Sequence, residues 1–303
     1  MLDKKFGIEV EFTGITRKRA AQITAEYLGV NLHAPADDYH TLVVSANDGR
    51  LWKLTHDASI KAQRKAGRNI ISANENYQAE LVSPILTYKE DIETVQELVR
   101  LIRKAGGFTN DTCGVHVHLD GADHSPRSIR NFINIIASKN DLLYKALQIP
   151  PERMRYCKKM DSFLVERMNR SKPRTFQKIE SIWYEGYREN RSNRYHDSRY
   201  FFLNLHSFFN GHRTVELRGF NAGRSGGNLH AGVIRAYVVL ALALNNQALT
   251  QQFASPRKVQ EENEKFAMRT YLNRLGLIGD EYKSCREHLC KHLSGNGAWR
   301  YRQ

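Results

Sequence analysis

Residues 4–14, KKFGIEVEFTG, have the pattern of a half-buried β-strand that carries two acids. Its four apolar residues occupy every second position, so their side chains point to one face of the strand. Glu9 and Glu11 therefore share the other face, about 6.6 Å apart. Two neighbouring carboxylates are compatible with a solvated sheet face and with a bound cation. The rest of the sequence decides between these interpretations.

Three further predicted strands carry acids or histidines where a half-buried strand usually carries Thr or Ser. They contribute Glu80 in AELVSP, His116 and His118 in GVHVHLDG, and Glu216 with Arg218 in TVELRGF. Residues at i and i+2 of a strand lie on the same face, so each pair is presented together. Each pair taken alone is more often a solvated face, but the set favours one polar surface built from four strands.

If these faces converge, the carboxylates need a cation. Two carboxylates about 5 Å apart repel by roughly 3 kcal/mol at an effective dielectric constant near 20. Oxygen-rich sites with an occasional imidazole suit Mg²⁺ or Mn²⁺, whereas zinc prefers more His and Cys. Arg218, which is always charged, would then face a phosphate or a substrate carboxylate. The pattern predicts a magnesium or manganese site that includes Glu9 and Glu11.

The order of the predicted elements is typical of an α+β fold. Strands occur in groups, one of them a hairpin turning at Asn47-Asp48-Gly49, and strict β-α-β alternation is rare. This favours a mostly antiparallel, curved sheet with helices on one face and an open polar face on the other. We expect a catalytic domain over residues 1–250, with a basic, mostly helical insertion at about 150–198. A helical extension over 251–303 is expected to pack on the same domain, with helices at 256–275 and 280–293.

Charge and composition limit the partners and the compartment. The 303 residues include 46 Lys and Arg against 32 Asp and Glu, a net charge of +14. This excess predicts anionic ligands such as nucleotide phosphates, acidic substrates or a nucleic-acid backbone. The sequence shows no apolar run of about 18 residues, no signal-peptide pattern and no dense cysteine framework. We therefore expect a cytoplasmic protein that does not span a membrane.

Six short motifs resemble, in this order, those of the amidoligase family. They are FGIEVEFTG, KLTHDASI, AELVSPIL, CGVHVHLDG, YFFLNL and TVELRGFNA, within about residues 6–245. That family is similar to glutamine synthetases and glutamate–cysteine ligases. The resemblance implies a glutamine-synthetase-like catalytic sheet and an ATP-dependent ligase that joins an amino-acid or peptide carboxylate to an amine. It also implies Mg²⁺ or Mn²⁺ between the nucleotide phosphates and the carboxylate.

The resemblance further implies roles for individual residues. The matching metal ligands are Glu9, Glu11, Glu80, His116 and Glu216. Arg218 matches the arginine that contacts the transferred phosphate, and His118 falls nearer to the nucleotide or substrate. Asp57 and Asn204 match positions that line the substrate pocket. Arg194 and Arg199 are candidates for binding an anion.

The implied reaction first converts a carboxylate to an acyl-phosphate, which an amine then attacks. A general base must deprotonate the ammonium, and Glu80, Asp57 and His118 are all candidates. The sequence has no Walker-type or G-x-G-x-x-G motif, so ATP would be held through metals and arginines. We interpret the glycine-rich stretch NAGRSGGN, residues 221–228, as a connector.

Two other functions are compatible with the same residues. Clustered carboxylates, histidine and a basic surface also suit a metal-dependent nuclease. A nucleic-acid-binding protein with a structural cation site is the non-catalytic alternative. The order of the motifs and the Glu216–Arg218 pair favour the ligase. Within that interpretation, the net charge suggests a large anionic substrate such as a nucleic acid or an acidic peptide.

Overall fold

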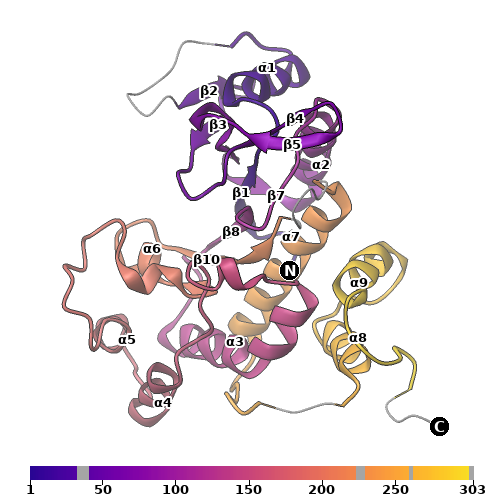
Figure 1. The fold of residues 1–303 in the computed structure, drawn as a ribbon. Coiled ribbons are helices and arrows are strands. Elements are labelled where there is room, and N and C mark those ends of the chain that lie inside the picture. Colours follow the sequence, from indigo (N-terminus) through magenta and orange to yellow (C-terminus); the bar gives the residue numbers. More distant parts are fainter. Residues whose placement is uncertain (33–40, 223–228, 259–261, 300–303) are drawn as a thin grey trace. The chain divides into compact units, whose positions relative to one another are not determined.

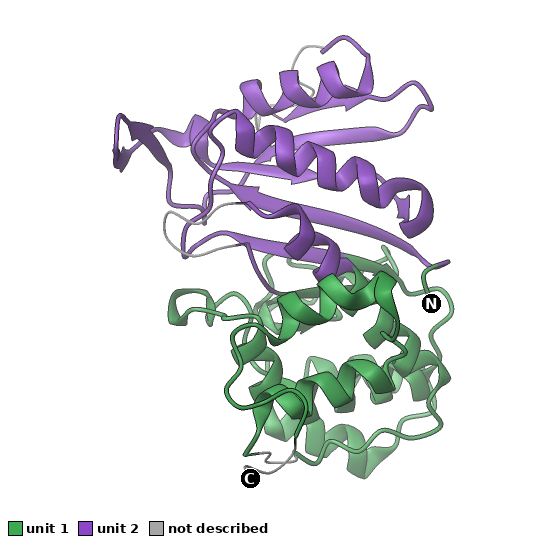
Figure 2. Ribbon diagram, turned by 90° about the vertical axis from the view of Figure 1, so that its right-hand side faces the viewer, with its two compact units in different colours: residues 1–2, 118–219, 239–303 green, residues 3–117, 220–238 purple. Residues whose placement is uncertain are grey.

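The structure is a computed structural model that describes residues 1–32, 41–222, 229–258 and 262–299. The chain divides into two compact units, each built from separate stretches of sequence (Figure 2). Unit 2 comprises residues 3–117 and 220–238, and unit 1 comprises residues 1–2, 118–219 and 239–303. As predicted, the fold is α+β with a mostly antiparallel sheet.

Unit 2 is organised around the first strand, β1 (Lys5–Phe12) (Figure 1). β1 pairs antiparallel with β6 (Ala79–Val82), β6 with β3 (Leu51–His56), and β3 with β2 (Leu42–Ser45). The short strand β7 (Leu86–Thr87) pairs with the start of β1. This register places Glu80 directly opposite Glu11 on one side and Thr55 on the other.

The apolar face of β1 forms the core of unit 2. Phe6, Ile8, Val10 and Phe12 are at most 2% exposed, and burying one such side chain stabilises the fold by about 2 kcal/mol. Helix α1 (Arg17–Leu28) packs against β2 and β3, and helix α2 (Tyr88–Lys104) packs against α1 and β7. Because side chains alternate along β1, the two glutamates point away from its apolar face.

Unit 2 also contains a second hairpin that the sequence pattern did not indicate. Strands β4 (Gln63–Ala66) and β5 (Asn69–Ser72) pair only with each other within the described residues. A short 3₁₀ helix, η1 (Glu75–Tyr77), leads from β5 into β6.

Three elements run from one unit into the other: β8 (Gly114–Asp120), β10 (Thr214–Asn221) and α7 (Ala231–Thr250). By length and composition, α7 could cross a membrane, whereas the sequence predicted no membrane-spanning segment. Its most apolar 18-residue window has a mean hydropathy of 1.3 and is 67% buried inside the protein. Buried core helices also meet this criterion, so it is weak evidence for a membrane span.

Unit 1 is mainly helical. Helix α3 (Pro126–Ala146) begins with a capping box between Ser125 and Ser128 and contacts α4, α5 and α8. Strand β9 (Leu203–Asn204) pairs antiparallel with β10. The remaining elements are η2 (Pro151–Arg153), α4 (Ser162–Ser171), α5 (Phe176–Trp183), η3 (Asp197–Tyr200), α6 (His206–Phe209), α8 (Glu264–Arg274), η4 (Asp280–Tyr282) and α9 (Lys283–Cys290).

Several predicted elements are shorter than expected. Helices occupy only part of the 150–198 segment, since residues 184–196 lie outside them. The motif YFFLNL contains only the two-residue strand β9, because the Asn204 side chain accepts a hydrogen bond from His206 N and the chain turns into α6. Helix α8 starts at Glu264 rather than near residue 256. Of the stretch NAGRSGGN, residues 223–228 lie outside the described residues.

Candidate functional site

Unit 2 gathers five of the predicted site residues into one group, which we call the carboxylate cluster. Its members are Glu9, Glu11, Asp57, Glu80 and His116, which come from β1, β6, β8 and the end of β3. Alternation along β1 and the β1–β6 register explain why side chains far apart in sequence point into one space.

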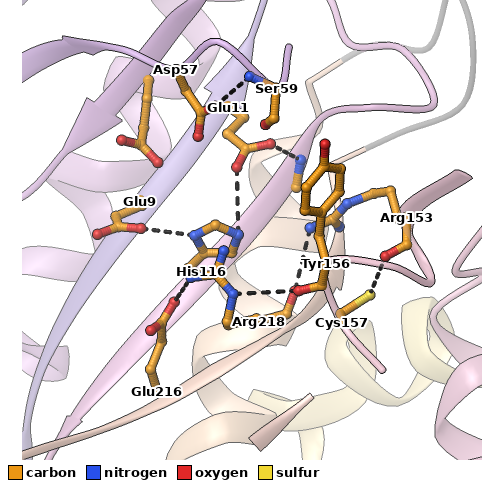
Figure 3. Close-up of polar contacts among 12 residues, drawn as sticks. Glu9, Glu11, Asp57, Ser59, His116, Arg153, Tyr156, Cys157, Glu216 and Arg218 are labelled. Atoms are coloured by element: carbon orange, nitrogen blue, oxygen red, sulfur yellow. Dashed lines mark hydrogen bonds and ion pairs between the residues drawn. The ribbon is translucent and has the colours of Figure 1, made fainter. Parts of the chain in front are cut away.

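Within the cluster, the His116 ring lies between two glutamates of β1 (Figure 3). Nδ1 is 2.7 Å from Glu9 Oε2, and Nε2 is 3.4 Å from Glu11 Oε1. The other oxygen of Glu11 accepts a hydrogen bond from Gly114 N at 2.5 Å. A neutral imidazole can donate to only one of its two neighbours. A cation beside the ring would compensate both carboxylates at once.

Glu80 is a strongly perturbed carboxyl at the centre of the cluster. Burial, followed by the charges of Glu9, Glu11 and Asp57, raises its pKa well above the usual range, and a hydrogen bond from Thr55 Oγ1 at 2.8 Å opposes this only partly. Thr55, which the sequence analysis did not select, lies opposite Glu80 on β3. Its pairing with Glu80 joins strands 25 residues apart in sequence, which the local pattern does not show.

The donor atoms of the cluster are close enough to share cations. Glu80 belongs to two triads, one with Glu9 and His116 and the other with Glu11 and Asp57. Within each triad the candidate ligand atoms lie within 4.8 Å of one another. Two like charges at this distance repel by roughly 3 kcal/mol at an effective dielectric constant of 20. Four carboxylates and one imidazole form a donor set that fits Mg²⁺ or Mn²⁺.

Unit 1 holds a second group built around a buried ion pair. Arg218 Nη1 lies 2.5 Å from Glu216 Oε1, and Asn204 Nδ2 donates to the other oxygen of Glu216 at 2.6 Å. The three residues are at most 7% exposed, and Glu216 lies directly opposite Asn204 across the β9–β10 pair. The carboxylate therefore fixes the position of Arg218.

Further contacts of Arg218 come from the basic segment that precedes β9. Its Nε donates to Tyr156 O at 3.4 Å, and its guanidinium lies 5.9 Å from the centre of the Tyr200 ring. Arg153 Nη2 donates to Arg218 O at 3.3 Å, and Arg153 is only 2% exposed. The sequence pattern did not indicate Arg153 as part of the site. A buried arginine in a short 3₁₀ helix carries no periodic pattern that would reveal it.

The predicted anion-binding arginines occupy different surroundings. Arg199 lies 5.7 Å from the centre of the Tyr200 ring, so Arg199 and Arg218 contact the same aromatic side chain. Arg199 Nη1 also donates to Arg194 O at 2.9 Å, and both guanidinium groups lie near the exposed Tyr195 ring. Arg194 itself is exposed.

Eight of the eleven predicted site residues thus form one group in each unit. His118, on the part of β8 that belongs to unit 1, is partly exposed. The convergence of His118, Asn204, Glu216 and Arg218 with the carboxylate cluster remains a prediction from the sequence.

Comparison with known proteins identifies the family. A family model described as "Putative amidoligase enzyme" matches residues 2–245. The chain belongs to this amidoligase family. Helices α8 and α9 lie beyond the matched residues.

The other comparisons add less. No curated protein matches the sequence. A crystal structure of a bifunctional glutathione synthetase from Pasteurella multocida is similar to this amidoligase-family chain at 12% sequence identity and a TM-score of 0.36. The match covers 96% of this chain and 47% of the other, so this chain spans about half the length of that protein. A TM-score of this size does not establish a shared fold.

Proposed function

We propose that this chain is an ATP- and Mg²⁺-dependent carboxylate–amine ligase that forms an amide bond through an acyl-phosphate. Its family supports an activity of the ligase kind. The observation that carries the proposal is the carboxylate cluster, in which Glu80 is surrounded by three other acids and a histidine. A bound cation would compensate the crowded negative charge of this group, which otherwise raises the pKa of Glu80.

The carboxylate cluster would hold the metal, with Glu9, Glu11, Glu80 and His116 as ligands. Glu216 is a further ligand by resemblance to the family. When bound, Mg²⁺ would neutralise phosphate oxygens and orient the nucleotide. Because the chain has no Walker-type motif, its own contribution to phosphate binding would come from arginines.

Arg218 would bind the transferred phosphoryl group or the substrate carboxylate. A guanidinium presents planar pairs of N–H donors that match both groups. Its ion pair with Glu216 and its place beside the Tyr200 ring hold it in one orientation before substrate arrives. Arg199, which contacts the same ring, would add a second positive charge. Asn204 positions Glu216 and so supports Arg218 indirectly.

The proposed reaction has two displacements. A carboxylate oxygen of the substrate attacks the γ-phosphorus of ATP, and ADP leaves. The nitrogen of a neutral amine then attacks the acyl carbon, and inorganic phosphate leaves. One proton of the ammonium must first be removed, and Asp57, Glu80 and His118 are the candidate bases. The carboxylate would belong to an amino acid or a peptide, and an acidic peptide would suit the net charge of +14.

The proposal is tested by phosphate release from ATP with Mg²⁺, mixed amino acids and amines. We expect amines to stimulate release and EDTA to abolish it. Glu11→Gln should lower the rate by at least about 100-fold, and Arg218→Lys by about 10- to 100-fold. Glu26→Gln, which alters an exposed acid of the same unit, is the matched control and should leave the rate unchanged.

Two results would contradict the proposal. The first is that the parent protein shows no ATP turnover, or that Glu11→Gln does not lower the turnover although this variant keeps the melting temperature of the parent. The second is cleavage of plasmid or RNA that needs Glu11 and no ATP. The second result would establish the nuclease alternative.

A further inference from the structure

The β4–β5 hairpin of unit 2 is exposed along nearly its whole length. All residues from Arg64 to Ser72 are exposed. Gly67 has φ 60° and Arg68 is not among the residues with positive φ, as expected for a two-residue type II′ turn. The two strands form a small sheet that is separate from the main sheet of the unit (Figure 1). A two-stranded ribbon is not stable by itself, so its base must be fixed.

The base of the hairpin is held by several hydrogen bonds around Gln63. Thr13 Oγ1 donates to Gln63 O and accepts from Gln63 N, both at 2.8 Å. Gly14 N donates to Gln63 O at 3.0 Å, and Asn110 Nδ2 donates to Gln63 Oε1 at 2.8 Å. Lys65 lies over the Phe108 ring, 5.8 Å from its centre. These contacts all involve β4, which leaves the outer edge of β5 uncovered by them.

The hydrogen-bond ladder shows which groups of β5 point outward. Ala73 N donates to Ala62 O at 3.0 Å, so the pair Ala62–Ala73 is hydrogen-bonded. Hydrogen-bonded and non-hydrogen-bonded pairs alternate along an antiparallel ladder. Ile70 and Ser72 therefore direct their backbone N–H and C=O groups away from β4. Neither residue has a hydrogen-bond partner outside the hairpin among the described residues.

The side chains of the hairpin combine positive charge with aliphatic surface. Residues 61–72 contain four cations, Lys61, Arg64, Lys65 and Arg68, and no acid. Ile70 and Ile71 are 40% and 38% exposed. Arg64 lies opposite Ile71, and Lys65 lies opposite Ile70. Residues opposite each other share a face, so each face carries one cation beside one isoleucine.

We propose that the outer edge of β5 binds an extended acidic peptide, which adds a strand to the hairpin. The outward groups of Ile70 and Ser72 would pair with the peptide backbone, as in other strand-addition complexes. Aliphatic side chains of the peptide would cover the two isoleucines, and its carboxylates would meet the four cations. The charge fits this occupant and opposes a second copy of the chain, because two hairpins would bring eight cations together. The proposal is independent of the proposed ligase activity.

The test uses the full chain and a fluorescein-labelled eight-residue peptide of the repeat Glu-Glu-Val-Val, which presents Glu and Val on both faces of an added strand. Binding is followed by fluorescence anisotropy. At 150 mM salt, where charges more than about 8 Å apart are largely screened, the peptide should bind saturably. A Gln–Val peptide, which lacks the charge, should bind at least about 10-fold more weakly. A Glu–Val peptide that is N-methylated at every second residue cannot donate backbone hydrogen bonds to β5. It should also bind at least about 10-fold more weakly.

Two variants separate charge from strand addition. Arg64→Glu with Arg68→Glu should weaken binding by about 10-fold or more. Ser72→Pro removes an outward N–H while leaving the β4–β5 ladder intact, and should also weaken binding by about 10-fold. Lys18→Glu with Lys104→Glu makes the same charge change at exposed positions of α1 and α2 and should change affinity by less than about 2-fold. Unchanged melting temperatures would show that all variants fold.

Several outcomes would overturn the inference. Equal weakening by the Lys18/Lys104 control would show non-specific attraction to the basic surface. Full binding by Ser72→Pro or by the N-methylated peptide would exclude strand addition. A 12-nucleotide single strand that binds where the peptide does not would identify a nucleic acid as the ligand. Self-association of the parent chain that is lost on Arg64→Glu would identify a second copy.

Discussion

At the scale of single residues, Glu80 combines a raised pKa with a central position in the carboxylate cluster. It belongs to both triads of the carboxylate cluster, and its neighbours include three acids. At pH 7.5 it is either charged beside these acids or protonated well above the ordinary pKa of a carboxyl. If Glu80 is ionised, the neighbouring acids repel it; if it is protonated, folding must bind a proton that the unfolded chain releases at this pH. In either state the fold is less stable than it would be with an uncharged side chain that does not titrate.

Replacing Glu80 by glutamine should therefore stabilise the metal-free protein. Glu80→Gln keeps the shape and can still accept the hydrogen bond from Thr55. We expect the free energy of unfolding in EDTA at pH 7.5 to rise by about 1–3 kcal/mol. Mg²⁺ should raise the melting temperature of the parent protein but not that of the variant. Equal stabilisation of both by Mg²⁺ would show that Glu80 is not a ligand.

Asn204 should be sensitive to the addition of one negative charge. Its Nδ2 donates to Glu216 at 2.6 Å, and both side chains are buried. Asn204→Asp would place two buried carboxylates in contact and should lower the free energy of unfolding by about 2–4 kcal/mol in urea at pH 8. Because the added repulsion requires ionised carboxylates, the loss should shrink as the pH is lowered to 5. A pH-independent loss would contradict this explanation.

At the scale of elements, β9 and β10 show how closely the backbone of unit 1 is packed. A Cβ added at Gly219 would lie 1.9 Å from the Phe202 ring, which is fully buried. Glycine at this position therefore allows β10 to approach the aromatic side chain. The sequence of β10 alone does not show this constraint, because it is a contact with Phe202, the residue before β9.

Gly219→Ala should be strongly destabilising. The methyl group requires Phe202 or the strand to move, and overpacking of this kind costs about 1–3 kcal/mol or more. Gly297→Ala is the control, because its Cβ would meet neighbours at 3.7 Å or beyond and its φ is not positive. Denaturant unfolding should separate the two variants by at least about 1 kcal/mol. Equal midpoints would show that Phe202 can move freely.

Sequence analysis predicted the elements whose own residues show apolar alternation or a turn motif. β1 alternates, and Asn47-Asp48-Gly49 marks the turn between β2 and β3, where Gly49 has φ 81°. The β4–β5 hairpin was missed because neither of its faces is buried, so its residues show no apolar alternation. The length of β9 depends on one hydrogen bond from His206 N to the Asn204 side chain, which no periodicity encodes.

The candidate site likewise contains residues that the sequence pattern predicted and contacts that it did not predict. Period-two spacing placed Glu9 and Glu11 on one face, and the structure brings both to His116. The contacts of Arg153 and Tyr156 with Arg218 depend on how an irregular basic segment folds back on β10. Such contacts join residues more than 60 positions apart and leave no local pattern.

At the scale of the whole molecule, three buried histidines link stability to pH. Burial lowers the pKa of His124, His196 and His206 below the ordinary value of 6.5. In the unfolded chain these rings bind a proton as the pH falls through 6.5, whereas the folded protein resists protonation. The unfolded state then holds more protons, so stability is lost from pH 6.5 down to the folded pKa values.

This linkage can be measured at His124. Its two ring nitrogens lie 2.9 Å from Ser128 Oγ and 2.8 Å from Asn245 Oδ1. His124→Gln removes the titrating group and can retain one of these contacts. Between pH 7.5 and 5.5 the parent protein should lose up to about 1.4 kcal/mol more stability than the variant. Identical losses in urea titrations at the two pH values would show that His124 does not contribute.

The division of the sequence between the units also sets the order in which the protein can be completed during synthesis. Unit 2 needs residues 220–238, which leave the ribosome only after the 102-residue stretch 118–219 of unit 1. Its N-terminal 115 residues must therefore wait, with their apolar strand faces incompletely covered, while most of another unit is translated. We expect the nascent chain to depend on chaperones during this interval and to become protease-resistant only after α7 has emerged.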